Sequence, residues 1–249
     1  MTTYIIISIL FGAIFGSFST FVGFRIFNED KDINILGKRS ICCNCKHELN
    51  ILDLIPVISF LALNGRCRYC NKKIPYWHFL AEIFMIISFI TATIYFGGIN
   101  QKTTLIWMIS WCLITQSIID FRTMMSSDII HIITLICSIF LAYLNGFSQK
   151  HIIITPFCIL TIFILLAIIS KKIFNKDCIG FGDIKLFVIL SPLFQIEKMP
   201  MFFGLCGFFG ICFYVLMMYL NRKHNKTFKA KQFPFIPSIF IAFLLAFYF

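Results

Sequence analysis

The sequence predicts an all-α, polytopic membrane protein with about eight transmembrane helices and one small cytoplasmic loop domain. Of its 249 residues, 59% are hydrophobic and only 13% are charged, whereas a soluble domain carries about 25% charged residues. The mean hydropathy is +0.88. Apolar segments of about 18 to 20 residues, the length needed to cross a hydrocarbon core, recur along the whole chain. Inside a bilayer the backbone polar groups of such segments must be satisfied within helices.

Eight apolar spans, joined by seven loops, are expected. The first, within "MTTYIIISILFGAIFGSFSTFVGF", lacks a basic start and a small-residue cleavage site, which favours a retained helix over a signal peptide. The sixth is short, so it either tilts or begins inside the protein near two glycines. The predicted spans are residues 4–24, 79–97, 103–120, 129–146, 152–170, 184–196, 200–220 and 233–249.

The basic residues predict the orientation of these spans. If the loop 28–78 is cytoplasmic, every Lys and Arg except Lys102, Lys150 and Lys198 lies on the cytoplasmic side. Such a bias places both termini outside the cytoplasm by the positive-inside rule. The net charge of +11 is therefore interpreted as basic loops facing anionic lipid headgroups, and no nucleic-acid partner is expected.

In this topology two carboxylates lie at the same face of the membrane. Asp120 ends the third span and Asp183 opens the sixth, both at the cytoplasmic side, and Asp128 begins the fourth span at the same level. Ionisable groups at membrane depth are costly and usually mark a functional pathway. Of two neighbouring carboxyl groups, one keeps a proton and acts as general acid while the other activates water. The topology thus predicts an aspartyl protease dyad.

The segment "GFGDIKLF" places glycines directly before Asp183. Gly180 and Gly182 have no side chains, so they let another backbone, such as a peptide substrate, approach closely and permit unusual dihedral angles. The alternative interpretation is structural, because aspartate is also a favoured N-cap of a helix. G-x-G-D alone does not decide between the two.

The loop 28–78 carries two Cys-x-x-Cys pairs. Cys42 and Cys45 form the first, and Cys67 and Cys70 the second. Two such pairs are typical of a tetrahedral zinc site, and a cytoplasmic location keeps thiols reduced. A redox dithiol or four free thiols is the alternative. Cys43, beside Cys42, leaves the identity of the first ligand open.

In order and spacing these motifs resemble those of the bacterial type IV prepilin peptidases, a family of membrane aspartyl proteases. The likeness covers nearly the whole chain: "GSFSTFVGFRI", "RSICCNC", "DLIPVISF", "GRCRYC", Glu82, the Asp120 segment and "GFGDIKLF". The resemblance implies eight membrane helices, a cytoplasmic zinc-binding loop domain and catalytic aspartates at Asp120 and Asp183. Domain boundaries of 1–27, 28–78 and 79–249 follow for the first helix, the zinc-binding domain and the peptidase domain.

The resemblance also implies an activity in the bacterial cytoplasmic membrane. The enzyme would remove the short basic leader of type IV prepilins or pseudopilins after glycine. Many family members also methylate the new N-terminus with S-adenosylmethionine, and the zinc would be structural because four thiolates leave no open coordination position. Two features differ from the usual pattern: Ser127 replaces a proline, and Cys43 lies where Cys-Pro-x-Cys is common.

Gly180, Gly182, Asp128 and Lys185 are expected to support the dyad. A second class of function stays open on the sequence alone, namely a non-enzymatic metal-binding transporter or assembly subunit. Archaeal preflagellin peptidases and presenilin-type proteases also use G-x-G-D. The four-cysteine loop favours the bacterial prepilin type over both.

Overall fold

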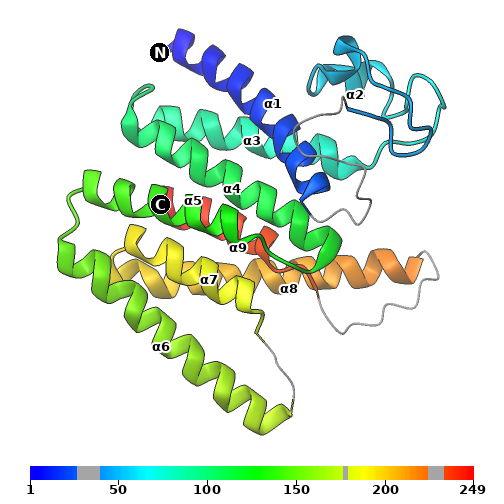
Figure 1. Ribbon diagram of the computed structural model, residues 1–249. Coiled ribbons are helices and arrows are strands. Elements are labelled where there is room, and N and C mark those ends of the chain that lie inside the picture. Colours follow the sequence, from blue (N-terminus) through cyan, green and yellow to red (C-terminus); the bar gives the residue numbers. More distant parts are fainter. Residues whose placement is uncertain (27–39, 176–178, 224–232) are drawn as a thin grey trace. The chain divides into compact units, whose positions relative to one another are not determined.

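The computed structural model describes residues 1–26, 40–175, 179–223 and 233–249. The start of the predicted loop domain, before residue 40, lies outside them, as do the loop residues 176–178 and 224–232. The chain divides into two compact units, Met1–Ile119 and Asp120–Phe249. Figure 1 shows the helices of each unit.

Each of the eight predicted spans overlaps one α-helix in the part of the chain that is described, but the sixth, residues 184–196, extends six residues beyond the end of α7 at Leu190. Five of the helices there, α1, α3, α4, α6 and α8, are long and apolar enough to cross a membrane. Their residues are α1 (Thr2–Arg25), α3 (Tyr76–Tyr95), α4 (Gln101–Thr123), α5 (Asp128–Leu144), α6 (Gln149–Phe174), α7 (Phe181–Leu190), α8 (Met199–Lys223) and α9 (Ile236–Tyr248).

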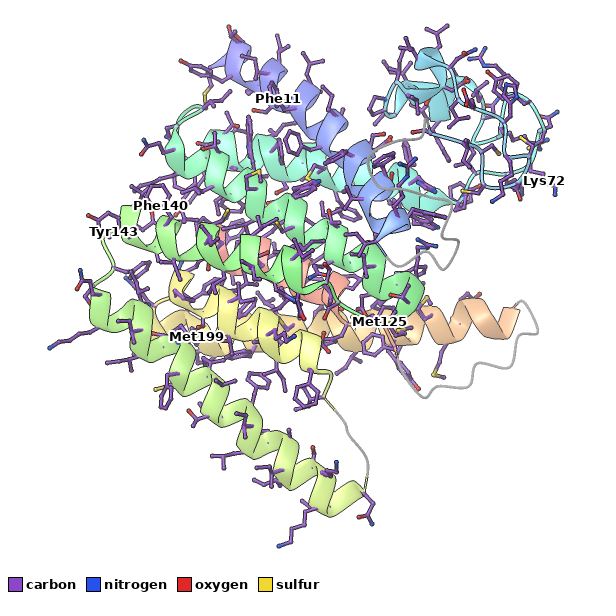
Figure 2. All side chains as sticks on the ribbon, in the orientation of Figure 1. Phe11, Lys72, Met125, Phe140, Tyr143 and Met199 are labelled. Carbon is purple, nitrogen blue, oxygen red and sulfur yellow. The ribbon has the colours of Figure 1, made fainter. Side chains whose placement is uncertain are left out.

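Many apolar side chains on these helices face outward. Phe11, Phe140 and Tyr143, labelled in Figure 2, are 47%, 47% and 63% exposed. On α6 nearly all the large aliphatic residues are exposed as well. A soluble protein rarely exposes apolar surface on this scale. The outward-facing surface therefore indicates a multi-pass membrane protein whose helices contact lipid.

The first unit is built on the antiparallel pair α1 and α3. The buried residues of α1 are all small: Ser8, Gly12, Gly16, Ser19, Thr20 and Gly23. Such a stripe lets two membrane helices approach closely. A Cβ atom added at Gly16 would lie only 2.6 Å from Cα of Glu82 in α3, and the hydroxyls of Ser8 and Thr93 share a buried hydrogen bond of 2.7 Å.

This close contact gives a testable prediction about stability. Gly16→Ala is expected to destabilise the protein by about 1–3 kcal/mol, because α1 must move away from the α3 backbone to admit the methyl group. The thermal unfolding midpoint in detergent would measure this. Gly207→Ala in α8 is the matched control, since its Cβ would meet nothing within 4 Å and alanine favours helix. Equal midpoints for Gly16→Ala and Gly207→Ala would contradict the predicted role of Gly16.

Between the two cysteine pairs lie a short 3-10 helix, η1 (Ile51–Leu54), and the helix α2 (Ile58–Ala62). Asp53 fixes this connection to the loop of the second Cys-x-x-Cys pair, because its carboxylate accepts hydrogen bonds from Nε of Arg68 at 2.7 Å and from the Tyr69 hydroxyl at 3.1 Å. Burial alone would raise the pKa of Asp53, but hydrogen bonds from Arg68, the Asn50 N–H and Tyr69 hold it below its usual value.

The second unit contains α5 to α9 and two further 3-10 turns, η2 (Ser191–Leu193) and η3 (Ile196–Lys198). Its core is aromatic: the rings of Phe194 and Phe202 stack with centroids 4.7 Å apart, and Phe243 meets Phe194 edge-on at 6.1 Å. The helix α7 has only 10 residues, roughly 15 Å at 1.5 Å per residue. That is about half the thickness of a hydrocarbon core.

Candidate active site and metal centre

The four paired cysteines come together in the first unit. The Sγ atoms of Cys42, Cys45, Cys67 and Cys70 all lie within 4.8 Å of one another, and those of Cys42 and Cys70 are 3.9 Å apart. Four sulfurs bound at about 2.3 Å to a central zinc ion would be about 3.8 Å apart. The cluster therefore has the donor set and nearly the dimensions of a four-thiolate metal site.

The two Cys-x-x-Cys loops, residues 42–45 and 67–70, share one backbone conformation. In each, the residue after the second cysteine donates its N–H to the carbonyl of the first cysteine, from Lys46 to Cys42 and from Asn71 to Cys67, both at 2.9 Å. Both donors lie in the left-handed region, with φ of 58° and 59°. An isolated β-bridge closes each loop. The tight turn directs both sulfurs of a pair toward the same point, as the Cys-x-x-Cys spacing predicts.

The structure distinguishes Cys42 from its neighbour Cys43. Cys42 belongs to the cluster, whereas Cys43 is exposed and lies outside it. Burial would raise the pKa of the Cys42 thiol, but hydrogen bonds from the backbone of Cys45 and Asn44 lower it to about 7. A thiol with this pKa is substantially ionised near neutral pH, and the thiolate is the form that binds metals.

Asp120 and Asp183 meet in the second unit. Asp120 lies in the last turn of α4 and Asp183 in the first turn of α7. The two carboxyl groups are close enough to interact electrostatically. Asp120 is only 8% exposed, and its Oδ2 accepts a hydrogen bond of 3.0 Å from the N–H of Ile236. The chain thus brings carboxylates from two distant segments within electrostatic range of each other.

The contact between Asp120 and Ile236 was not foreseen from the sequence. Ile236 is the first residue of α9, so the carboxylate lies at a helix N-terminus, where backbone N–H groups lack partners within the helix. The Phe235 N–H also hydrogen-bonds to Asp120. Pro237 at the start of the last apolar span was the available signal, since proline is common in the first turn of a helix.

Gly180 and Gly182 lie where other side chains leave no room for a Cβ atom. Gly180 is the N-cap of α7 with an ordinary φ of −70°, so the expected unusual dihedral angle is not found there. A Cβ at Gly180 would lie 2.9 Å from Oδ2 of Asp183, and one at Gly182 would lie 2.5 Å from Oγ of Ser126. The glycines therefore permit close approach to Asp183 on one side and to the chain before α5 on the other.

Asp128 and Lys185 form an ion pair beside this site. Nζ of Lys185 donates to Oδ1 of Asp128 at 2.6 Å, and the two side chains are 48% and 73% exposed. The pair joins the N-terminus of α5 to the first turns of α7. Lys185 lies two residues after Asp183 in that helix. His131 of α5 is buried below it, with Nδ1 at 3.8 Å from Asp128. The contact is suited to fixing the position of α7.

Breaking this pair gives a second prediction. Lys185→Met and Asp128→Asn are each expected to lower kcat for leader cleavage about twofold to fivefold, since an exposed pair contributes up to about 1 kcal/mol. KM and the unfolding midpoint should change little. Steady-state kinetics on both single variants and the double variant would measure this. The double variant should be no slower than either single variant. Additive losses would show that the two residues act independently.

Glu82 makes a contact that the sequence motifs did not reveal. Its Oε2 accepts a 2.7 Å hydrogen bond from the N–H of Val57, the N-cap of α2. Val57 has φ of 63°, which is rare for a β-branched residue. The buried carboxylate of α3 therefore holds a strained turn of the loop domain against the membrane helices of the first unit.

Each of the two units matches a model of a known protein family. Residues 10–96 match the family model of the bacterial peptidase A24 N-terminal domain, and residues 107–215 match that of the type IV leader peptidase family. The chain belongs to the type IV leader peptidase family. The leader-peptidase match includes Asp120 and Asp183, whereas the N-terminal match includes all four clustered cysteines.

Relatives of this leader peptidase match over most of their length. Proteins named prepilin leader peptidase/N-methyltransferase include one from Vibrio cholerae, 26% identical over 98% of this chain and 96% of its own. Another, from Bacillus subtilis, is 28% identical over 96% and 91%. One from Pseudomonas aeruginosa is 24% identical over 84% and 71%. No solved structure matches the chain.

Proposed function

We propose that this leader peptidase is a membrane aspartyl endopeptidase that removes the short basic leader of type IV prepilins or pseudopilins after glycine. The observation that carries the proposal is the meeting of Asp120 and Asp183 in a chain of this family. Gly180 also supports it, because a side chain at this position would press on the carboxylate of Asp183, with Cβ only 2.9 Å from Oδ2.

The two carboxyl groups would share one proton during the reaction. The ionised group takes a proton from water, whose oxygen then bonds to the scissile carbonyl carbon. As the C–N bond breaks, the protonated group supplies the proton that the leaving amine requires. Because the titration belongs to the pair, neither aspartate is assigned as acid or base.

The proposed topology places this reaction at the cytoplasmic membrane surface. All eight helices named in the fold would cross or enter the membrane, with both termini outside the cytoplasm and the basic loops inside. The leader of the substrate would then lie on the cytoplasmic side and its hydrophobic helix in the bilayer.

A second activity, N-methylation of the new N-terminus by S-adenosylmethionine, is proposed from the names of the relatives. We also propose that Cys42, Cys45, Cys67 and Cys70 bind a structural zinc ion. All four positions around the ion would be thiolates, so none is left for catalysis.

Cleavage of a model prepilin by the full-length protein, purified in detergent, tests the endopeptidase function. The expected products are the intact leader ending in glycine and a pilin that begins at the next residue, identified by mass spectrometry. Absence of cleavage, or cleavage within the hydrophobic helix, would overturn the proposal.

A further inference from the structure

The segment between the two Cys-x-x-Cys pairs exposes large apolar side chains. Four of them, on η1 and α2, are 59% to 84% exposed. These four residues form the apolar patch: Ile51, Leu52, Ile58 and Leu61. Asp53 is the only charged residue between residues 51 and 63, and its side chain is 4% exposed and paired with Arg68. The outer surface of this segment is therefore apolar.

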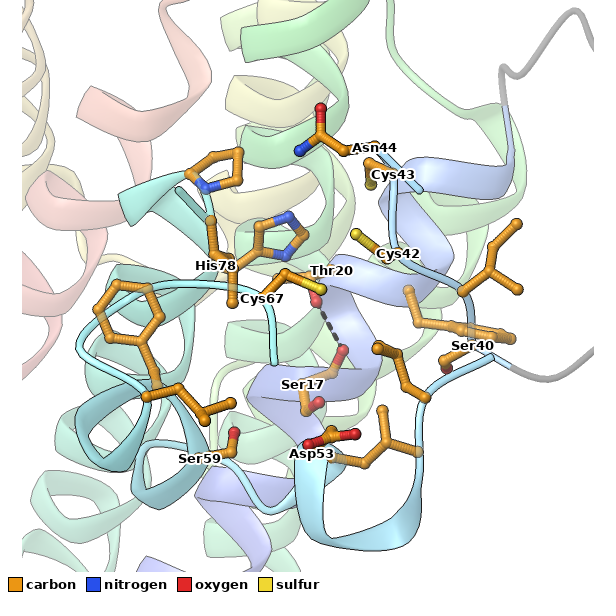
Figure 3. A pocket seen from close by; sticks show the side chains of 18 of the residues that line it. Ser17, Thr20, Ser40, Cys42, Cys43, Asn44, Asp53, Ser59, Cys67 and His78 are labelled. Atoms are coloured by element: carbon orange, nitrogen blue, oxygen red, sulfur yellow. Dashed lines mark hydrogen bonds between the residues drawn. The ribbon is translucent and has the colours of Figure 1, made fainter. Parts of the chain in front are cut away.

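The polar side chains of the same segment point inward. Asp53 of η1 and Ser59 of α2 line a cavity that also borders Ser17 of α1. Figure 3 shows these side chains around one space, and the four residues of the apolar patch do not line it. A helix that faces water turns its apolar side chains toward the core and its polar ones outward. The inverted arrangement here is typical of a segment whose outer face contacts lipid.

The contacts of α2 place it beside the membrane helices of the first unit rather than beyond their ends. The N–H of Val57, the N-cap of α2, donates to Glu82, which follows Tyr76, the first residue of α3, by six positions. Six residues correspond to about 9 Å along a helix. Glu82 also lies opposite Gly16 of α1, well before Arg25 at the end of that helix. The start of α2 is therefore level with the first turns of α3.

The segment also adjoins the outward-facing surface of α3. Phe60 of α2 stacks on Phe79 with ring centroids 4.9 Å apart, and it meets Tyr76 edge-on at 6.1 Å. Tyr76 starts a stripe of exposed residues that lie three or four positions apart on one face of α3: Tyr76, Leu80, Phe84 and Ile87. This face belongs to the surface that contacts lipid, so the lipid beside α3 also reaches α2.

Basic side chains follow the segment directly in the chain. Arg66 and Arg68 come after α2 and are exposed. Long basic side chains at a membrane edge extend to the headgroups, where they attract anionic lipids. Exposed apolar residues with basic residues beside them are typical of interfacial segments. Such segments are buried about 5–10 Å into the boundary between headgroups and acyl chains.

We propose that η1 and α2 form an interfacial membrane anchor, with the apolar patch inserted into the leaflet next to the loop domain. The occupant of the patch is phospholipid, and neither a second copy of the chain nor the substrate is needed to cover it. The inference rests on the membrane location of the chain and is independent of the proposed peptidase and methyltransferase activities. The anchor ties the loop domain to the bilayer in addition to its contacts with α1 and α3.

Photo-crosslinking identifies what covers the patch. In the full-length protein Ile58 is replaced by p-benzoylphenylalanine, and the protein is irradiated in vesicles of phosphatidylethanolamine and phosphatidylglycerol. The control carries the same label at Lys72, an exposed residue at the edge of the loop domain away from α2 (Figure 2). We expect about tenfold more phospholipid adduct at Ile58 than at Lys72, measured by mass spectrometry, because only the first label lies in the interfacial layer.

The other possible products would overturn the proposal. Cross-links from Ile58 to a second copy of the chain would identify the patch as a dimer face. Cross-links that form only when prepilin is added would identify a surface for the substrate. Equal yields of lipid adduct at Ile58 and Lys72 would show that the patch does not enter the bilayer.

A second experiment removes the anchor. Ile58→Glu combined with Leu61→Glu brings two charges to the patch, and a protease added to the vesicles should then cut the loop domain about tenfold faster, because charges are costly in the bilayer. Lys72→Glu, a charge change elsewhere on the same domain, should be cut at the wild-type rate. An unchanged unfolding midpoint in detergent would separate release of the anchor from unfolding. Equal rates for the double variant and the wild type would contradict the anchor. If the double variant unfolds, the lipid adducts at Ile58 decide.

Discussion

Asparagine in place of Asp183 or Asp120 is expected to slow leader cleavage by about 10³-fold or more. General acid–base groups contribute about 10²- to 10⁴-fold each, and the two carboxyl groups act as one unit, so loss of either should nearly equal loss of both. The double variant should be no slower than the slower single variant. Single-turnover cleavage of a model prepilin would measure all three rates.

Binding of the substrate separates this result from simple unfolding. Asparagine is nearly the same size as aspartate, so both variants should still bind prepilin and keep the wild-type unfolding midpoint. Glu197→Gln, an amide substitution at an exposed carboxylate, should cleave at the wild-type rate. Variants at Asp120 and Asp183 that cut as well as wild type would mean that these carboxylates serve structure or transport, which is the non-enzymatic alternative.

Loss of a cluster cysteine is expected to have the second large effect. Cys42→Ser should lower the affinity for zinc by more than the about 10- to 100-fold that changes outside the ligand set cause, because it removes one of four thiolates. Zinc content after dialysis against a chelator, measured by atomic emission, would show this. The loop domain should then become sensitive to proteolysis, since metal binding and folding of such sites are coupled.

Cys43→Ser is the matched control one residue away. Its side chain lies outside the cluster, so this variant should retain the metal and the protease resistance of the wild-type protein. Loss of zinc in Cys43→Ser with retention in Cys42→Ser would show that the ligand order is the reverse of the one described. Loss of zinc in neither variant would contradict a four-thiolate site at these positions.

The helices could be predicted from the sequence because the bilayer leaves few alternatives. A long apolar segment must form a helix so that its backbone polar groups are hydrogen-bonded inside the bilayer. The uneven distribution of basic residues then predicts which end of each helix faces the cytoplasm. The same argument predicts that Asp120 and Asp183 lie at one face of the membrane. The short α7 was harder to delimit, because its aromatic surroundings, such as Phe202 and Phe203 around Phe187, are set by tertiary packing.

The supporting contacts could not be predicted, because each joins residues whose proximity depends on packing. Nothing in the residues near Asp120 indicates that the N–H of Ile236 reaches it, and nothing near Glu82 indicates the strained Val57. The cysteine register was also ambiguous in sequence, since Cys42 and Cys43 are adjacent. It becomes clear in the structure because only Cys42 matches the position that Cys67 has in the second loop.

A metal ion bound by both Cys-x-x-Cys loops would have a topological consequence. An ion held by Cys42 and Cys70 would cross-link the chain into a closed ring that contains η1 and α2. By the relation for disulfide-closed loops of this length, such a cross-link removes roughly 3–4 kcal/mol of conformational entropy from the unfolded chain at 25 °C. The ring would therefore restrain the turn at Val57, so an ion bound only by the four thiolates would help to keep the carboxylate of Glu82 hydrogen-bonded to the Val57 N–H.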